Sequence, residues 1–157
     1  MLFTLVRLVV AATAASATAS PQLHTKIRAA DSPACVNGVA ASSGATFPIE
    51  DYTQIVPTAQ SDSYTINQTW YNSHYISDHY IGGKRGDDGY SAFKCQYNCN
   101  ALGSSCASFF VYWFNLGTQE EQAKCVLFNA TIDQSNYVAA GAGTAVAGGF
   151  DRLCTKK

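Results

Sequence analysis

The chain contains 157 residues, of which 47% are hydrophobic and 13% charged, and its formal net charge is −1. This balance gives no reason to expect nucleic acid or an anionic membrane as a partner. The 6 cysteines, an even number, predict disulfide bonds in an exported protein and argue against an intracellular zinc site. Neither a metal nor a cofactor is expected.

Residues 1–19 have the pattern of a secretory signal peptide. Arg7 lies early, residues 5–15 are otherwise mostly apolar, and the small residues at 17–19 favour cleavage before Ser20. The stretch is too short, and too rich in alanine, serine and threonine, for a transmembrane anchor, and no later stretch approaches ~18 apolar residues. The remaining chain, roughly 138 residues, is expected to be secreted, extracellular or associated with the cell wall, and to form one domain.

The domain is placed at 35–157. Residues 20–34 show no hydrophobic period and are predicted to form a flexible leader. Between 35 and 63, glycine and proline residues are interspersed with short β-like pieces such as 51–56. One or two strands among loops are expected there.

Aromatic side chains are concentrated between 64 and 90, among polar residues. Exposed tryptophan and tyrosine rings stack on sugars and dominate protein interfaces, so this segment is a candidate ligand-binding surface. The plainer interpretation is that it is a structural cover over a sheet. The residues assigned to the hypothetical site are Trp70, Tyr71, Tyr75 and Tyr80, with Lys84 and Arg85 as polar contacts.

No catalytic or metal-binding pattern is recognisable in the sequence. His74 and His79 are five residues apart, which suits neither one helix face nor one strand face for joint metal ligation. The acids are scattered, and no serine or cysteine lies in a nucleophile motif. Asn67 and Asn129 begin N-glycosylation sequons, so both are predicted to lie on the surface and to be glycosylated.

A short helix is predicted at 92–102. Ser91 is a suitable N-cap, Gly103 is a suitable residue just past the C-terminus, and apolar residues recur at helical spacing between them. Cys95 and Cys99 then project from one face of this helix.

Strands are predicted after the helix, at 106–115 and 125–129, because both segments are rich in aromatic and β-branched residues. Residues 137–149 are rich in alanine and glycine and carry no charge. A loop is expected there, leading into a last strand near 150–154.

The cysteines and their neighbours resemble the PAN/Apple domain. The order is CxxxC at Cys95 and Cys99, then Cys-Ala-Ser-Phe from Cys106, then Cys-x-Leu-Phe from Cys125, with one distant cysteine on either side. The ending GGFDRLC at 148–154 resembles the close of such domains in small secreted proteins of filamentous fungi. The match covers 91–154 and is poor before it.

The resemblance implies a disulfide pairing, which spacing alone does not select from the 15 that six cysteines allow. The implied pairs are Cys35–Cys154, Cys95–Cys125 and Cys99–Cys106. The expected fold is α+β, a disulfide-stapled antiparallel β-sheet of about five strands cradling one short α-helix. The implied function is a secreted, non-catalytic module that binds carbohydrate or protein at the cell surface or cell wall. The alternative is a small secreted hydrolase with an unrecognised active site.

The implied Cys99–Cys106 bridge also predicts which way the strand side chains point. Counting by twos from Cys106 and Cys125 directs one set toward the helix: Ser108, Phe110, Tyr112, Phe114 and Leu127. The opposite face then carries Phe109, Val111, Trp113, Val126 and Phe128. Residues 35–90 are expected to cover most of this second face, because so many apolar groups do not stay bare in a soluble monomer. The competing interpretation is that the sheet face is itself the partner surface.

Overall fold

The computed structural model describes residues 34–42, 44–57, 63–82, 85–141 and 143–154. The predicted signal peptide, most of the predicted leader and the predicted contact Lys84 lie outside the described residues. In chain order the elements are β1 (Tyr52–Ile55), β2 (Tyr64–Ile66), α1 (Gln68–His74), β3 (Tyr75–Ile81), α2 (Asp88–Ala101), the 3-10 turn η1 (Gly103–Ser105), β4 (Ser108–Phe114), β5 (Gln122–Phe128), the 3-10 turn η2 (Gln134–Asn136), β6 (Tyr137–Ala139) and β7 (Thr144–Arg152).

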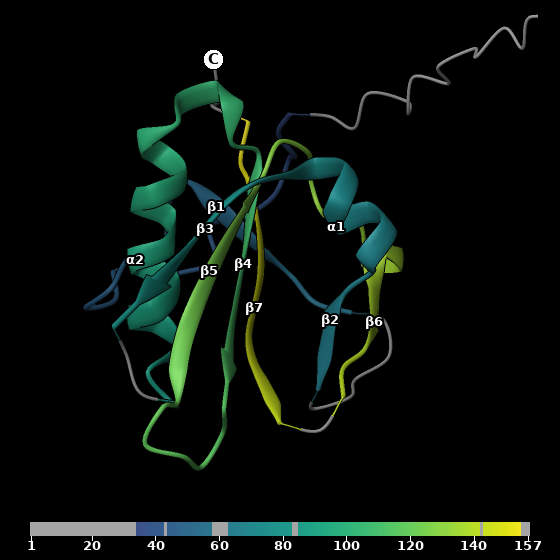
Figure 1. The fold of residues 1–157 in the computed structure, drawn as a ribbon. Coiled ribbons are helices and arrows are strands. Elements are labelled where there is room, and N and C mark those ends of the chain that lie inside the picture. The colour runs from purple at the N-terminus through teal and green to yellow at the C-terminus, as the bar shows by residue number, and fades with distance from the viewer. Residues whose placement is uncertain (1–33, 43, 58–62, 83–84, 142, 155–157) are drawn as a thin grey trace, which may run out of the picture.

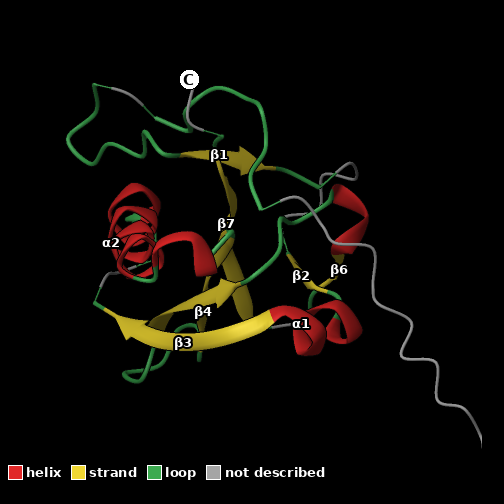
Figure 2. Ribbon diagram, turned by 90° about the horizontal axis from the view of Figure 1, so that it is seen from above, coloured by secondary structure: helices red, strands yellow, loops and turns green. Residues whose placement is uncertain are grey.

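A five-stranded antiparallel sheet lies at the centre, in the strand order β1-β7-β4-β5-β3. Helix α2 covers one face, and α1 lies with the two-stranded β2–β6 sheet on the other side (Figure 1, Figure 2). The predicted α+β fold, a disulfide-stapled sheet with a short helix, is confirmed, and α1 and the second sheet are additions to it. No helix in the described part of the chain is long and apolar enough to cross a membrane.

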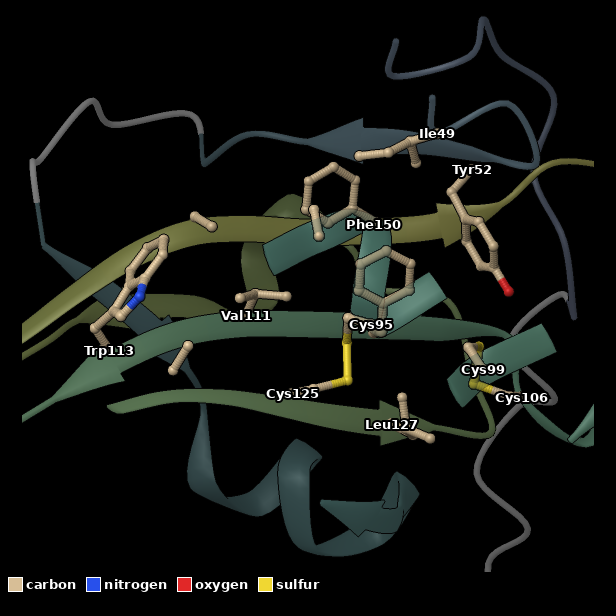
Figure 3. Packing of buried hydrophobic residues seen from close by; sticks show 14 residues of the cluster. Ile49, Tyr52, Cys95, Cys99, Cys106, Val111, Trp113, Cys125, Leu127 and Phe150 are labelled. Carbon is tan, nitrogen blue, oxygen red and sulfur yellow. A yellow bond between two sulfur atoms is a disulfide. The ribbon is translucent and has the colours of Figure 1, made fainter. Parts of the chain in front are cut away.

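Three disulfides hold the helix and the chain ends in place, and their pairing is the one that the resemblance implies. Cys95–Cys125 joins the middle of α2 to β5, and Cys99–Cys106 joins its last turn to the segment before β4 (Figure 3). Cys35–Cys154 links the two ends of the domain. The Cα–Cα distances of 5.0, 5.5 and 5.4 Å lie in the range that a disulfide allows.

Helix α2 begins before the predicted position. Asp87 occupies the N-cap position, and Asp88 lies in the first turn, where a negative charge interacts favourably with the helix dipole. Ser91 is therefore a buried residue inside the helix, and its prediction as the N-cap is wrong. The prediction for the other end is confirmed, because Gly103 follows the C-cap Leu102 with a φ of 57°, the left-handed conformation that ends many helices.

The predicted orientation of β4 is wrong. Phe109, Val111 and Trp113 belong to the core cluster that also contains the buried residues of α2. Figure 3 shows Val111 and Trp113 in this cluster. The alternate residues, predicted to face the helix, point away from it: Ser108, Phe110, Tyr112 and Phe114. The orientation of β5 is confirmed, with Leu127 on the helix side and Val126 and Phe128 on the other.

Cys106 explains the error in β4. It lies between η1 and the first residue of β4, so its bridge to the end of α2 does not fix the pleat of the strand. The bridge that does so is Cys95–Cys125. Val111 lies directly opposite Cys125, and directly opposed residues of an antiparallel pair share a face.

Much of the stretch 137–149, predicted to be a loop, instead belongs to β6 and to the first part of β7, while the last strand predicted near 150–154 overlaps the end of β7. Strand β7 lies between β1 and β4, so both of its edges are paired. Small residues suit this central position, since a Cβ on Gly149 would collide with the Tyr137 hydroxyl. Gly148, with a φ of 129°, lies at the irregular pairing of β7 with β4. The alanine and glycine content thus reflects close approach within the sheet.

The far face of the sheet, defined as the face away from α2, carries a second core cluster. Phe110, Val126 and Phe128 are covered by Ile66 of β2 and by the half-buried rings of α1. Ile132 and Tyr137, which follow β5, complete the cover. The expectation that 35–90 covers this face is therefore correct for β2 and α1, but residues after β5 also contribute to the cover.

Candidate functional site: an aromatic surface on strands β3 to β5

Strand β3 presents Tyr75, Asp78 and Tyr80 on the far face of the sheet. In a regular strand Tyr75 and Asp78 would point to opposite faces, because they are an odd number of residues apart. An irregularity in the β3–β5 pairing between Tyr75 and Ser77 takes up one residue. Tyr75 consequently lies opposite Phe128, Asp78 opposite Val126 and Tyr80 opposite Lys124. The three side chains share one surface, and Tyr75 and Tyr80 are 42% and 66% exposed.

Neighbouring rings extend this surface in both directions. The ring centroid of Phe114 lies 5.9 Å from that of Tyr80 and 6.3 Å from that of Tyr112. At the other end of β3, Tyr71 stacks on Tyr75 with centroids 5.3 Å apart and an interplanar angle of 21°. We call this surface the tyrosine face; its members are Tyr71, Tyr75, Asp78, Tyr80, Tyr112, Phe114 and Lys124.

An ion pair lies within the tyrosine face. The Nζ of Lys124 is 2.7 Å from Oδ2 of Asp78 and 5.5 Å from the ring centroid of Tyr80. The hydrogen bond to Asp78 raises the pKa of Lys124, so the ammonium stays charged. Burial raises the pKa of Tyr71 to about 12 and also raises the pKa of Tyr112. Both hydroxyls are thus protonated at neutral pH and able to donate hydrogen bonds.

Three of the four predicted aromatic residues lie on this surface. Tyr71 and Tyr75 meet at one end of β3, and Tyr80 lies at the other. Trp70 instead is half-buried, with its ring centroid 4.9 Å from that of Phe128 and 4.8 Å from that of His74. Trp70 contributes to the structural cover. Tyr71 combines both positions, because its centroid is also 5.5 Å from that of Phe128.

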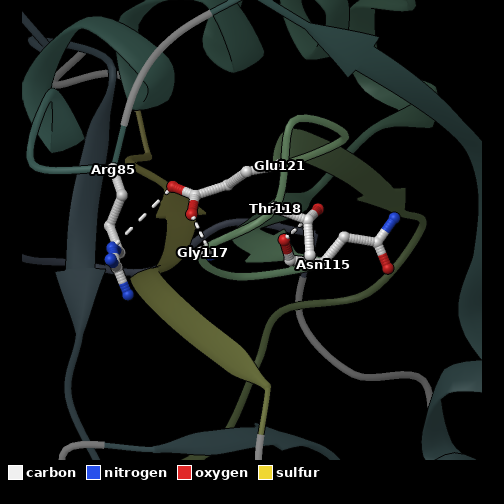
Figure 4. Close-up of polar contacts among 5 residues, drawn as sticks. All are labelled: Arg85, Asn115, Gly117, Thr118 and Glu121. Carbon is white, nitrogen blue, oxygen red and sulfur yellow. Dashed lines mark hydrogen bonds and ion pairs between the residues drawn. The ribbon is translucent and has the colours of Figure 1, made fainter.

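Arg85 lies beyond the end of β3, against the turn that joins β4 and β5 (Figure 4). Its Nε is 3.8 Å from Oε1 of Glu121, and the other carboxylate oxygen of Glu121 accepts a hydrogen bond from the Gly117 N–H at 2.8 Å. Thr118 Oγ1 donates to the Asn115 carbonyl, also at 2.8 Å, within the same turn. Because the Arg85 side chain is 52% exposed, the ion pair adds little stability. Its structural contact is with the turn and not with the tyrosine face.

The predicted sequon asparagines are both exposed, as expected, while their glycosylation stays a prediction. Asn67 caps α1 by accepting hydrogen bonds from the N–H groups of Thr69 and Trp70. Oδ1 of Asn129 lies 3.1 Å from Nδ1 of His74. Among the residues that the structure describes, no group of three or more histidines, cysteines and acids is arranged to hold a metal ion.

Four members of the tyrosine face are missing from the site predicted by sequence: Asp78, Tyr112, Phe114 and Lys124. The wrong orientation of β4 had assigned Tyr112 and Phe114 to the helix side. The signal for Lys124 is alternation along β5, which places it on the same face as Val126 and Phe128. Alternation along β3 likewise places Asp78 on the same face as Tyr80, whereas the irregularity that brings Tyr75 onto this face leaves no mark in the sequence.

Comparisons of this chain with protein-family models, with curated proteins and with solved structures give no match. The resemblance to the PAN/Apple domain therefore stays a prediction, which rests on the residues of the chain.

Proposed function

We propose that this protein is a secreted, non-catalytic binding module that recognises carbohydrate at the cell surface or cell wall through the tyrosine face. The observation that carries the proposal is the exposure of Tyr75 and Tyr80 on one face, on either side of the Asp78–Lys124 ion pair. Secretion is supported by the pattern of residues 1–19 and by the three disulfides.

The chemistry of the tyrosine face suits a chain of sugars. Exposed aromatic rings stack on the apolar faces of sugar rings, and charged groups form strong hydrogen bonds to hydroxyls. Asp78 accepts hydrogen bonds and Lys124 donates them, so a sugar hydroxyl beside the pair finds both kinds of partner. At ~3.3 Å per residue, Tyr75 and Tyr80 lie on the order of 15 Å apart along β3. That separation matches an oligosaccharide with one sugar against each ring.

A protein partner is the second candidate, and the position of β3 favours it. Among the described strands, β3 is the end of the five-stranded sheet and pairs with β5 alone. The backbone N–H and C=O groups along its outer edge are therefore able to pair with an added strand. Such a partner combines main-chain hydrogen bonds with side-chain contacts on the tyrosine face.

A binding assay on cell-wall polysaccharides tests the proposal. The secreted chain is incubated with insoluble polymers and on a glycan array, and both retention and soluble sugar products are measured. We expect retention on at least one carbohydrate with no product released. Release of soluble sugars would favour the alternative of a small hydrolase, and a failure to bind any carbohydrate would remove the first candidate.

A further inference from the structure

A groove of about 610 Å³ lies on the other side of β3, between this strand and helix α2. One wall comes from β3 and the other from α2. His79 lies opposite Cys125, which is bridged to Cys95 on the helix, so His79 points to the helix side. On α2, Phe93 and Tyr97 form one row and Lys94 and Asn98 form a second, each pair one helical turn apart. The volume is typical of a site for a small molecule.

The aromatic row gives the groove an apolar wall. The rings of Phe93 and Tyr97 meet edge to face, with centroids 5.0 Å apart and an interplanar angle of 85°. Tyr97 is 58% exposed, whereas the opposite face of α2 is buried in the core. Ile81 lies on the β3 side of the groove and is packed against the core cluster. An exposed ring above a supported apolar wall fits the face of a sugar ring.

The second row makes the groove a site for negative charge. Lys94 and His79 line it, together with the amide of Asn98, and no acidic side chain among the described residues does. In the described part of the chain the acids that form ion pairs are Glu121 and Asp78, and neither is paired with Lys94. The Nζ of Lys94 lies 5.5 Å from the Tyr90 ring centroid, a contact that leaves its hydrogen-bond donors available. Asp87 and Asp88 precede this part of α2 and do not line the groove.

We infer that this groove binds a carboxylated sugar, a uronic acid unit of an acidic oligosaccharide. The sugar ring lies against Tyr97, and its carboxylate accepts a charge-assisted hydrogen bond from Lys94 and a further hydrogen bond from the imidazole of His79. Asn98 supplies a donor and an acceptor for ring hydroxyls. The groove adjoins the tyrosine face at Tyr80, which lines it, whereas His79 and Tyr75 project from opposite sides of β3.

Titration calorimetry with a linear oligogalacturonate tests this inference on the secreted chain. The comparison ligands are a neutral oligosaccharide of the same length and an oligoglutamate of the same charge. We expect the oligogalacturonate to bind, and both comparison ligands to bind roughly 10-fold more weakly, because each lacks one of the two features of the site. Tighter binding of the oligoglutamate would overturn the sugar assignment in favour of an acidic peptide.

Variants then locate the site. Lys94→Gln and Tyr97→Ala are each expected to lower the affinity for oligogalacturonate roughly 10-fold, since both side chains are exposed and their loss leaves the fold intact. Lys94→Arg keeps the charge and should retain most of the affinity. Val138→Ala, an exposed apolar position on β6 outside both sites, is the control and should bind oligogalacturonate normally. Unchanged affinity in Lys94→Gln, or no binding by the wild type, would overturn the inference and leave the proposal for the tyrosine face standing.

Discussion

The buried carboxyl group of Asp151 makes the stability of the fold depend on pH. Asp151 is 1% exposed on β7, and its Oδ1 accepts a hydrogen bond from the Ile132 N–H at 2.7 Å. Burial raises the pKa of this carboxyl from 3.8 to about 7, against the opposing effect of the Ile132 hydrogen bond. The native state therefore binds the proton more tightly than the unfolded chain does. The free energy of unfolding should fall as the pH rises from about 4 to about 7 and level off above that range.

The substitution Asp151→Asn isolates this effect, because it keeps a carbonyl oxygen for the Ile132 N–H and removes the titration. A pKa difference of about 3 units corresponds to about 4 kcal/mol. The variant should match the wild type near pH 4 and be more stable by about 4 kcal/mol near pH 8.

Urea unfolding with the disulfides intact measures the difference, provided that both proteins show the same dependence on urea concentration. The pKa of Asp133 is lowered by hydrogen bonds from Ser135, so its contribution to stability is lost at still lower pH and stays outside the measured range. Parallel curves for the two proteins between pH 4 and 8 would refute the reasoning, as would a wild-type stability that rises over this range.

Three further predictions concern the disulfides, the central strand and the buried tyrosines. Replacing Cys95 and Cys125 by alanine should lower the unfolding free energy by about 4 kcal/mol, and replacing Cys99 and Cys106 should lower it by about 2 kcal/mol, because the first pair closes a longer loop. Urea unfolding measures both losses, and a larger loss for the second pair would contradict this prediction. Gly149→Ala should cost about 1–3 kcal/mol through its collision with Tyr137, whereas Gly141→Ala, in open space, should cost little in the same assay. Burial raises the pKa of Tyr137 and raises that of Tyr52 to about 12, so the free energy of unfolding should fall above pH ~10. Tyrosinate absorbance from these two residues should appear only as the protein unfolds. Ionisation of every tyrosine in the folded state would argue against this burial.

The sequence predicts the core elements of this fold better than it predicts the candidate binding surface. Helix α2, β5 and the core that joins them follow from apolar periodicity around Cys95, Cys99 and Cys125, since helix and strand periods are local properties. The sequence does not predict which side chains of β4 face the helix, because Cys106 lies outside the strand and the register of β4 depends on long-range pairing. The end of β7 is predicted by the strand near 150–154, but its first part is not, because the central position requires small residues, which resemble a loop in composition.

The candidate site shows the same limit. Tyr75 and Tyr80 are recognisable by residue type, but only the irregular pairing between Tyr75 and Ser77 brings Tyr75 onto the face that Asp78, Tyr80 and Lys124 share. Trp70 has the same amphipathic character as its neighbours. Its position on α1 turns it onto Phe128, and no local feature of the sequence distinguishes a covering ring from an exposed one.

The affinity of Tyr80→Ala for the polysaccharide that retains the wild type tests the central claim most directly. An exposed ring that contacts ligand contributes affinity and little stability, so we expect the affinity to fall by roughly 10-fold or more with an unchanged Tm. Val138→Ala, another exposed apolar position, is the control and should change neither quantity, whereas Trp70→Ala should lower the Tm because its ring covers Phe128. Normal binding by Tyr80→Ala, or a loss of binding that only follows unfolding, would contradict the assignment of the tyrosine face.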